Sequence, residues 1–569
     1  MHINMNNSTS FISTFSILLL LAGHLSAQTL YINGKIITVD ASDRIAEAIA
    51  VQEGKITAVG TTEEILQNKT MDAEVVDLKG KTVVPGFIDG HSHFMGLFRG
   101  QAVNLGSPPM GEVRNIAELV TSIQTFQQQK ELKEEEWIQG FGYDQDQLAE
   151  RRHPTKEDLD EAFPNTPVFI TNINGHMGVA NSVALRLSGI TADTPNPEGG
   201  AIERKKGSQE PTGLLQESAK GLLKIPAKPK ASLEEQLQNL RDQQLFYASQ
   251  GITTAQDGYT SLPSLILLKQ AADRGQLIID IEALPGAQFL DEVIKNPDFE
   301  FGKIKNHLKL AGTKQIADGS PQGKTAYFTK PYLTEVPGCI HDECNGFPNI
   351  TQEQFNAFIL KAFKHHIRPF VHCNGDATID MYLTAIKKAS GELNINSTEV
   401  RPVTIHSQFV RPDQLDSYKE LGIIPAFFSN HAFFWGDVHI RNLGIERARF
   451  LSPLKSAQKR GIIATNHTDY PVTPVNQLFL LWTAVNRETR SGQIIGEEER
   501  LTPIEGLRTI TINGAYQYRE EQIKGSIEPG KLADLVILSK DISTIDPKTI
   551  KDVEVLETIK EGKSIYKKL

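Results

Sequence analysis

The chain has 569 residues, of which 39% are hydrophobic and 22% are charged, and its formal net charge is -10. This length exceeds one ordinary domain, and the composition is typical of a folded globular protein rather than a disordered one. The acidic balance argues against nucleic acid as the main partner, because binding to phosphates requires a basic face.

The N-terminal segment resembles a signal peptide. Phe11 to Ala22 is a short apolar run, and small residues follow it at Ser26-Ala27. The run is too short to span a bilayer comfortably, although residues 1–10 contain no Lys or Arg. We expect residues 1–27 to be removed during export to the periplasm or the exterior, which leaves no membrane span in the mature chain. If they are not a signal peptide, the protein is cytoplasmic.

Both ends of the chain carry short strand patterns. Asn33-Gly34 lies inside the apolar stretch 30–39 and signals a hairpin, and Glu53-Gly54 signals a second one. Near the other end, the turn Glu528-Pro529-Gly530 precedes an apolar strand at 532–538. These patterns predict a small β-sandwich domain built from residues 28–85 and 520–569.

The apolar stretch 83–88 leads into His91-Ser92-His93. Alternate side chains of an extended strand point the same way, so these two imidazoles are expected to face one side together. Imidazole is the commonest protein ligand for zinc-like metals, and two converging rings make half of a metal site. The alternative is a pair of surface histidines at the end of a strand.

The middle of the chain alternates strand and helix patterns. Helices are expected at Leu233–Ser249, Gln352–Lys364 and Ile379–Ala389. With the strand that leads to His93, the strands number eight; the other seven lie at 252–256, 279–284, 310–316, 368–372, 403–406, 423–428 and 462–465. This alternation predicts an α/β fold with a (β/α)8 TIM-like barrel over residues 86–519. A large insertion, at about 107–230, is expected to lie over the barrel mouth.

The three cysteines, Cys339, Cys344 and Cys373, do not form a disulfide framework by number or spacing. Cys339-x-His341-xx-Cys344 lacks the second half of a zinc knuckle. We interpret these as ordinary loop residues in preference to a structural zinc site.

Potential metal ligands stand where the predicted strands end. These residues are Lys314, His372, His406 and Asp469. Because the carboxyl ends of barrel strands converge on one face, the four are expected to join His91 and His93 there. The sequence therefore predicts a convergent cluster that binds divalent metal.

At this point the sequence resembles the amidohydrolase superfamily of metal-dependent hydrolases. Within it, the chain is similar to the YtcJ-like branch, which includes N-substituted formamide deformylase. The matching motifs, which extend over nearly the whole chain after residue 28, are Pro85-Gly86-Phe87-Ile88-Asp89-Gly90-His91-Ser92-His93, Lys314-xxx-Asp318-Gly319-Ser320, His372-xx-Gly375-Asp376, Ile405-His406, Thr468-Asp469-xx-Val472, and Gly525 to Asp534. In the insertion they are Gly142-Tyr143-Asp144, Gly175-His176, Asn181-Ser182 and Pro211 to Leu214.

The resemblance implies a role for each ligand. His91 and His93 would hold the more buried ion, and His372 and His406 the more exposed one. Lys314 would bridge the two ions as a carbamate formed with CO2, because a free ammonium has only donors and cannot ligate. The alternative for Lys314 is an ordinary salt bridge. Zinc is the expected metal, as one or two ions, although other divalent ions are compatible with these ligands.

Asp469 is the expected catalytic residue as well as a metal ligand. It would take a proton from the attacking water and deliver it to the leaving nitrogen. The implied activity is hydrolysis of non-peptide carbon–nitrogen bonds, in amides or N-formyl compounds, by attack of metal-bound hydroxide. The same site could serve an esterase, a lactonase or a cyclic-amide hydrolase, and a deaminase is less favoured. A non-catalytic exported binding protein is the alternative from another class.

Further polar residues are candidates for binding a small-molecule substrate: Tyr143, His176, Glu217 and His431. A structural role is the alternative for each of the three aromatic residues, and Glu217 is also a carboxylate that competes with Lys314 for the bridging role. His467 departs from the family pattern, which has a small residue near this position. We rank packing first for His467, ahead of narrowing the pocket or contacting a metal ligand. The sequence leaves assembly into a homo-oligomer open.

Overall fold

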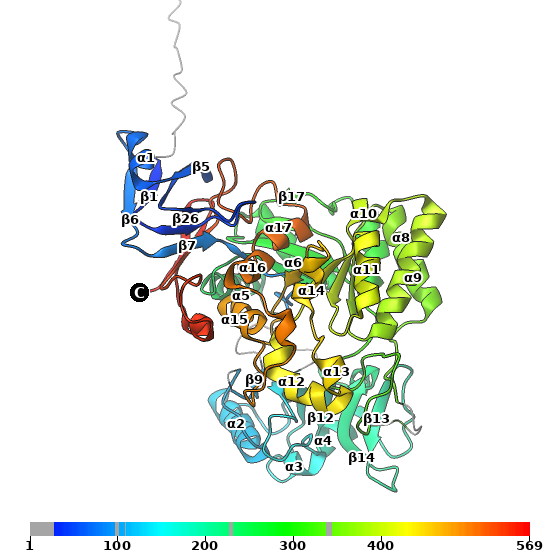
Figure 1. Cartoon of the computed structure of the whole chain (residues 1–569). Coiled ribbons are helices and arrows are strands. Elements are labelled where there is room, and N and C mark those ends of the chain that lie inside the picture. The colour runs from blue at the N-terminus through cyan, green and yellow to red at the C-terminus, as the bar shows by residue number, and fades with distance from the viewer. Residues whose placement is uncertain are drawn as a thin grey trace, which may run out of the picture.

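The computed structural model describes residues 28–96, 102–108, 110–173, 175–226, 231–336, 339 and 344–569. The predicted signal segment 1–27 and His341 lie outside these residues. The fold has three parts (Figure 1): sheets formed by the two chain ends, a central α/β body, and a separate sheet formed by residues between 103 and 217.

The chain ends form two sheets. The first contains, in spatial order, β5 (Lys55–Gly60), β4 (Ala48–Gln52), β1 (Thr29–Ile32) and β6 (Glu74–Asp77). The second contains β26 (Lys563–Lys567), β25 (Val555–Lys560), β24 (Leu535–Leu538), β7 (Thr82–Pro85), β2 (Lys35–Ile37) and β3 (Ile45–Ala46). Ile49 of the first sheet and Val83 and Leu535 of the second belong to one buried cluster, so the two sheets share a core.

One predicted hairpin is wrong. The Asn33-Gly34 turn does not join two paired strands, because β1 pairs with β4 and β6 whereas β2 pairs with β3 and β7. The turn instead passes the chain from one sheet to the other. The Glu53-Gly54 hairpin is confirmed, since β4 and β5 are antiparallel and both turn residues have positive φ, 51° and 76°.

The central body contains two five-stranded sheets. One has the order β17 (Ile304–Lys305), β18 (Leu308–Leu310), β16 (Asp280–Pro285), β15 (Ile252–Thr260) and β8 (Phe87–Ile88). The other has β19 (Thr313–Ile316), β20 (Pro369–Cys373), β21 (Val403–His406), β22 (Ile424–Phe427) and β23 (Thr465–Asn466). All neighbours pair in parallel except β17 with β18, and a parallel bridge between Gly286 and Lys314 joins the two sheets. This order is consistent with the predicted barrel.

The predicted strand 310–316 is interrupted at Ala311-Gly312, between β18 and β19. Gly312 is required there, because a Cβ atom would lie 2.3 Å from the carbonyl oxygen of Arg368. The interruption leaves Lys314 on β19, beside Phe370 of β20. Backbone packing between neighbouring strands thus sets the position of this lysine.

Helices connect the strands of the body. The three predicted helices are confirmed as α5 (Leu233–Ala248), α8 (Gln352–Lys364) and α9 (Asp376–Leu393). Capping boxes begin α5 at Ser232 and α8 at Thr351. The other connecting helices of six or more residues are α6 (Leu262–Asp273), α7 (Leu290–Lys295), α11 (Pro412–Leu421), α12 (Asn430–Leu443), α14 (Leu454–Lys459), α15 (Gln477–Asn486), α16 (Pro503–Thr509) and α17 (Ile512–Tyr518).

The segment between the first and second body strands forms a sheet of its own. Its order is β13 (Gly200–Arg204), β14 (Pro211–Glu217), β12 (Met177–Ala180), β11 (Val168–Asn172), β10 (Ile138–Tyr143) and β9 (Val103–Asn104). Helices α2 (Ile116–Gln129), α3 (Lys156–Asp160) and α4 (Ser182–Ser188) accompany it. Figure 1 shows this unit beside α12 and α13 (Ile445–Ala448), away from the chain-end sheets.

Cys339 and Cys344 are joined by a disulfide, whereas Cys373 is free and buried in β20. The interpretation of Cys339 and Cys344 as ordinary loop residues is therefore wrong. Their close spacing brings the two Cα atoms to 6.2 Å, within the range that a disulfide spans.

Candidate metal centre

His91 and His93 converge on Asp469. The two histidines follow β8, and Asp469 follows β23. The Oδ1 atom of Asp469 lies 3.3 Å from Nε2 of His91 and 3.5 Å from Nε2 of His93. Asp469 has a φ of 52°, a strained backbone conformation of the kind that accumulates at functional sites.

The His91 ring is held in one orientation by β15. Its Nδ1–H donates a hydrogen bond to Oε1 of Gln256, whose amide nitrogen donates to the carbonyl of Gly90. This bond leaves the lone pair of His91 Nε2 directed at the cluster. Gly258 makes room for the ring, since a Cβ atom there would lie 2.1 Å from its Cε1 atom. Burial and then Lys314 lower the pKa of His91 to about 4, which favours the neutral imidazole that binds metals.

His372 and His406 lie next to each other at the ends of β20 and β21. Nδ1 of His372 is 3.0 Å from Nε2 of His406, and the ring centroids are 4.5 Å apart. His406 also lies near the first pair, with its Nδ1 atom 3.9 Å from Oδ2 of Asp469. Burial lowers the pKa of both imidazoles well below the usual range, so both are neutral.

Lys314 is brought to the same cluster. Its Nζ atom lies 3.1 Å from Nε2 of His91, and the residue is only 1% exposed. Burial lowers the pKa of this amine to about 7. The Asp469 carboxylate acts in the opposite direction and raises it, so the choice between a salt bridge and a carbamate for Lys314 stays a prediction.

The donor set fits a divalent cation. Ligand atoms of His91, His406 and Asp469 all lie within 4.8 Å of one another. Among the described residues, Nδ1 of His406 and Oδ1 of Asp469 are buried without a hydrogen-bond partner. Burial raises the pKa of Asp469, but His406, His91 and His93 lower it well below its usual range. An anionic carboxylate among neutral imidazoles is the environment that a metal ion stabilises.

His176 and Glu217 form a pair beside this cluster. Nδ1 of His176 lies 2.9 Å from Oε2 of Glu217, and the His176 ring centroid lies 5.8 Å from that of His372. Glu217 has a φ of 49°, and its Oε1 atom is buried without a hydrogen-bond partner in the described part of the chain. Both residues come from the separate sheet region, so that unit reaches the cluster.

His431 and Tyr143 are more enclosed. Nδ1 of His431 is 3.0 Å from Nε2 of His439, and its ring packs against Phe428 and Trp435. The hydroxyl of Tyr143 is 3.0 Å from Nδ1 of His153, and its ring belongs to the core of the separate sheet unit. Burial lowers the pKa of His431 well below its usual range, and Asp469 and His467 also act on it. A substrate-binding role for His431 and Tyr143 stays a prediction.

His467 lies inside the cluster. Its ring centroid is 5.2 Å from that of His91 and 5.0 Å from that of His406, and the ring stacks on Phe428. The side chain is fully buried, and neither ring nitrogen has a hydrogen-bond partner among the described residues. The packing role expected from the sequence agrees with these contacts.

Sequence reasoning assigned no role to two polar groups that touch His372. Nδ2 of Asn374 lies 2.9 Å from Nε2 of His372, and Oδ1 of Asp318 lies 3.5 Å from the same atom. Asp318 also accepts hydrogen bonds from the backbone N–H groups of Asn374 and Gly375. Asp318 could have been identified from its place in the Lys314-xxx-Asp318-Gly319 motif. No feature of the sequence distinguishes Asn374.

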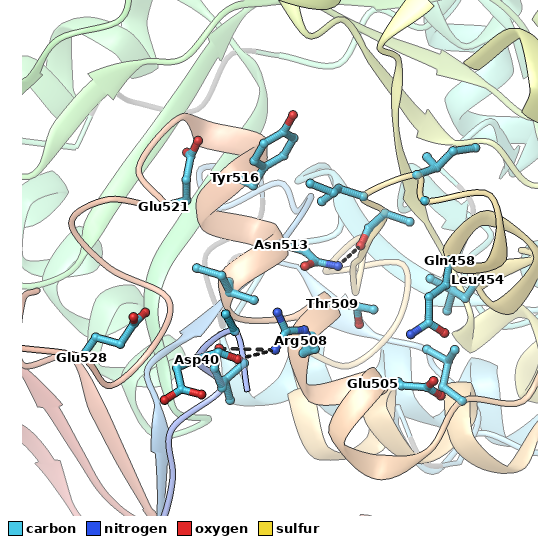
Figure 2. A pocket seen from close by; sticks show the side chains of 18 of the residues that line it. Asp40, Leu454, Gln458, Glu505, Arg508, Thr509, Asn513, Tyr516, Glu521 and Glu528 are labelled. Carbon is cyan, nitrogen blue, oxygen red and sulfur yellow. Dashed lines mark hydrogen bonds between the residues drawn. The ribbon is translucent and has the colours of Figure 1, made fainter. Parts of the chain in front are cut away.

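A surface pocket of about 470 Å³ lies elsewhere, between α14, α16 and α17 (Figure 2). Arg508 donates a hydrogen bond to the carbonyl of Asp40 at 2.9 Å, and Asn513 donates one to the carbonyl of Ala464 at 2.8 Å. None of the predicted site residues lines this pocket. This pocket is therefore separate from the predicted site, whatever its size.

Comparison with known protein families shows to which family this chain belongs. The model of the amidohydrolase family matches residues 74–566. The chain belongs to the amidohydrolase family. This amidohydrolase is 29% identical to N-substituted formamide deformylase from Arthrobacter pascens, over 94% of this chain and 98% of the relative. It is 28% identical to the putative amidohydrolase YtcJ of Bacillus subtilis, over 92% and 96% of the two chains.

Solved structures agree with this membership at the level of the fold. An uncharacterized metal-dependent hydrolase from Pyrococcus furiosus matches with a TM-score of 0.69 and 24% identity, over 91% of this chain and all of the other. Membership of the amidohydrolase family, and not the likeness in fold, identifies the chain as a hydrolase that acts on carbon–nitrogen bonds. Among the described residues, no helix combines the length and apolar character needed to cross a bilayer.

Proposed function

We propose that this amidohydrolase hydrolyses non-peptide amides, with N-formyl compounds as the preferred class. The observation that carries the proposal is the position of the Asp469 carboxylate, which lies 3.3 to 3.9 Å from nitrogens of His91, His93 and His406. The similarity to N-substituted formamide deformylase, which extends over nearly both chains, supports the N-formyl class.

The metal would be divalent, with zinc as the proposed ion. His91, His93 and Asp469 would hold one ion, and His372 and His406 a second. Such ions lower the pKa of water towards neutrality and polarise a carbonyl group. The imidazoles contribute neutral donors whose orientation is fixed by neighbours, as with the bond from His91 to Gln256.

Lys314 is proposed to act as a carbamate. Its neutral amine would form an N–C bond with CO2 and release one proton, which gives a carbamate with one negative charge shared by two oxygens. Support comes from the position of Nζ beside Nε2 of His91 and from its burial, which excludes an ordinary surface salt bridge.

Asp469 is proposed to move the proton. Its carboxylate would take a proton from the attacking water and give it to the amine nitrogen as the C–N bond breaks. The buried Oδ1 atom, which has no hydrogen-bond partner in the described part of the chain, is free to accept that proton. His176 and Glu217, adjacent to His372, are proposed to bind the substrate.

The domain organisation is proposed to match the family fold. The eight parallel strands would close into a (β/α)8 barrel over residues 86–519, with the chain-end sheets as a β-sandwich domain. The unit at about 107–230 would cover the barrel mouth, which agrees with the contact between His176 and His372.

Export is also proposed. Disulfides persist in oxidising compartments and are rare in the cytosol. The Cys339–Cys344 disulfide therefore supports the interpretation of residues 1–27 as a signal peptide. N-terminal sequencing of protein isolated from the native host tests this, since export predicts a start at Gln28 and cytoplasmic residence predicts an uncut N-terminus.

A substrate panel tests the activity. Purified wild type and Asp469→Asn are assayed with formamides, N-acyl amino acids, esters and lactones. The proposal predicts amide turnover by the wild type and a loss of kcat of at least about 100-fold in the variant, the scale of a positioned acid or base. Asp416→Asn, which alters a surface residue, is the control. A wild type without amide hydrolysis, or a variant as active as the wild type, would exclude the mechanism.

A further inference from the structure

Helix α17 packs one face against the strand that leads to the first pair of histidines. Ala515 and Tyr518 of this helix belong to a buried cluster that also contains Ile88 of β8. Gly514 allows the close approach, because a Cβ atom there would lie 2.8 Å from Cγ2 of Ile88. The helix that precedes the C-terminal strands therefore contacts the segment from which His91 extends.

The Tyr518 hydroxyl is hydrogen-bonded on both sides within this contact. The residue is only 1% exposed. Its oxygen accepts a hydrogen bond from Nε2 of Gln256 at 2.7 Å, and it lies 3.0 Å from the carbonyl oxygens of Asp89 and Gly90. A phenol has a single O–H donor, and carbonyl oxygens only accept. The hydroxyl hydrogen is therefore directed at these carbonyls, which leaves the oxygen to accept from Gln256.

These contacts fix which way the Gln256 amide points. Its Nε2 group has two N–H donors, which go to the Tyr518 hydroxyl and, at 3.1 Å, to the Gly90 carbonyl. A reversed amide would place its own oxygen against the carbonyl oxygen of Gly90, and neither of these oxygens can donate. The Oε1 atom of Gln256 is therefore left facing Nδ1 of His91.

The amide in turn sets the tautomer of His91. Because Oε1 of Gln256 only accepts, Nδ1 of His91 carries the proton, and Nε2 keeps its lone pair. This Nε2 atom lies 3.3 Å from Oδ1 of Asp469, inside the proposed centre. Tyr518, Gln256 and His91 thus form a chain in which each hydrogen bond determines the orientation of the next group.

We propose that Tyr518 is a positioning residue of the metal centre, which acts through Gln256 to keep the lone pair of His91 directed at the ion. The inference rests on the proposed metal-dependent function and adds to it a residue of α17 that touches neither the ion nor its ligands. Groups that orient a ligand contribute to metal affinity in this way. The loss of the hydroxyl is therefore expected to appear in metal binding.

Zinc affinity tests this inference. The variants are Tyr518→Phe and Gln256→Met, each alone and combined, and Tyr382→Phe is the matched control. Tyr382 is also fully buried, and its hydroxyl donates to the carbonyl of Val403 at 3.3 Å, so the control loses one buried hydrogen bond outside the chain to His91. Zinc binding is measured by competition with a chromogenic chelator, and His91→Ala identifies which binding step belongs to the ion that His91 holds.

The chain of hydrogen bonds predicts the size and the coupling of the effects. Tyr518→Phe is expected to weaken this zinc step about tenfold, and Gln256→Met by about 10- to 100-fold. The double variant is expected to bind within about twofold of Gln256→Met, because the hydroxyl acts through the amide. An unchanged zinc affinity in Tyr518→Phe, or a further tenfold loss in the double variant, would overturn the inference.

Stability distinguishes positioning from a purely structural role. Tyr518→Phe and Tyr382→Phe each lose one buried hydrogen bond, so the Tm values of the two metal-free variants are expected to fall by similar amounts. Only Tyr518→Phe is expected to lose zinc affinity, whereas Tyr382→Phe should stay within about twofold of the wild type. Equal losses of zinc affinity in the two variants would reject positioning.

Failure of the proposed function would look different. If the wild type binds zinc but hydrolyses no amide, the amide-hydrolase proposal fails, and the zinc titrations still decide the role of Tyr518. If amides are hydrolysed and Tyr518→Phe binds zinc as tightly as the wild type, only this inference fails. A wild type without a zinc step that His91→Ala removes rejects the inference together with the centre.

Discussion

The Nζ atom of Lys314 lies 3.1 Å from Nε2 of His91, across 223 positions of sequence. Burial lowers the pKa of Lys314 to about 7, although the Asp469 carboxylate raises it. The imidazole beside the amine supplies no negative charge to an ammonium. The contact is reasonable if the lysine supplies an anionic ligand to the same ion that His91 binds.

Replacement of Lys314 tests that role. Lys314→Met is expected to lower metal affinity by roughly 10- to 100-fold or more, while Lys314→Glu retains part of it because its carboxylate offers anionic oxygens. Metal content after dialysis is the measurement, and Lys455→Met, at the protein surface, is the control. In the wild type, labelled bicarbonate should also give a carbamate ¹³C signal that the Met variant lacks. Equal metal content in all four proteins would refute the role.

Removal of the metal should destabilise the fold. A ligand that binds only the native state adds about 4 kcal/mol at a concentration a thousandfold above its Kd. Chelation is therefore expected to lower the Tm, and zinc is expected to restore it. The double variant His91→Ala/His93→Ala is the control: because it loses the ligands of one ion, chelation should lower its Tm less than it lowers that of the wild type. A wild-type Tm that does not respond to chelator or zinc contradicts the proposed centre.

His467 should tolerate an apolar replacement. Neither ring nitrogen has a hydrogen-bond partner in the described structure, so His467→Leu removes no bond and keeps most of the contact with Phe428. We expect His467→Leu to change the free energy of unfolding by less than about 1.5 kcal/mol, which corresponds to a small shift in Tm. His467→Ala leaves a cavity and should lower the Tm by more. A large loss of stability or of metal content in the Leu variant would show that the imidazole binds a group at the centre.

A buried charge network should make the protein acid-sensitive. Asp280 accepts a hydrogen bond from Lys560 at 2.8 Å and pairs with Lys524, with all three side chains nearly inaccessible. Burial raises the pKa of Asp280, but the two lysines lower it well below its usual range. A depressed folded-state pKa contributes stability above the unfolded value of about 3.9, and this stability is lost as the pH falls.

Asp280→Asn is accordingly expected to lower the free energy of unfolding by about 3–5 kcal/mol near pH 7, because the buried ammonium groups of Lys524 and Lys560 then lack one of their carboxylate partners. The difference from the wild type should begin to shrink below about pH 5 and continue to shrink as the pH falls through the unfolded value towards the lower folded-state pKa, because the wild type loses the contribution of its carboxylate there. Urea unfolding at several pH values measures this, with the surface variant Asp416→Asn as the control. A difference that is independent of pH would refute the assignment of charge to Asp280.

The site was predictable from local sequence because its residues stand at strand ends. His372 ends the apolar run before it, and His406 does the same on the next strand, so the sequence predicts that both lie at the same edge of the sheet. The register pairs His372 with Ile405 and His406 with Cys373, and His406 has a φ of 72°, so the contact between the two rings depends on a backbone conformation that the sequence does not reveal. The residues that orient these ligands could not be predicted in the same way. Gln256 holds His91 from the middle of β15, where nothing in the local pattern distinguishes it from other buried strand residues.

Other features depend on contacts that the local pattern does not contain. The Asn33-Gly34 turn has the residues of a hairpin, yet the strands on either side find different partners: β1 pairs with β4 and β6, and β2 pairs with β3 and β7. The Cys339–Cys344 disulfide was likewise not predicted, because the number and spacing of the cysteines do not determine which of them pair.

Anomalous X-ray diffraction from crystals of the zinc-loaded protein tests the central claim most directly. The account predicts one or two anomalous peaks in data collected above the zinc edge, which largely vanish in data collected below it, bounded by His91, His93, Lys314, His372, His406 and Asp469. Zinc found only outside this group of side chains, or no anomalous peak in a protein that hydrolyses amides, would contradict it.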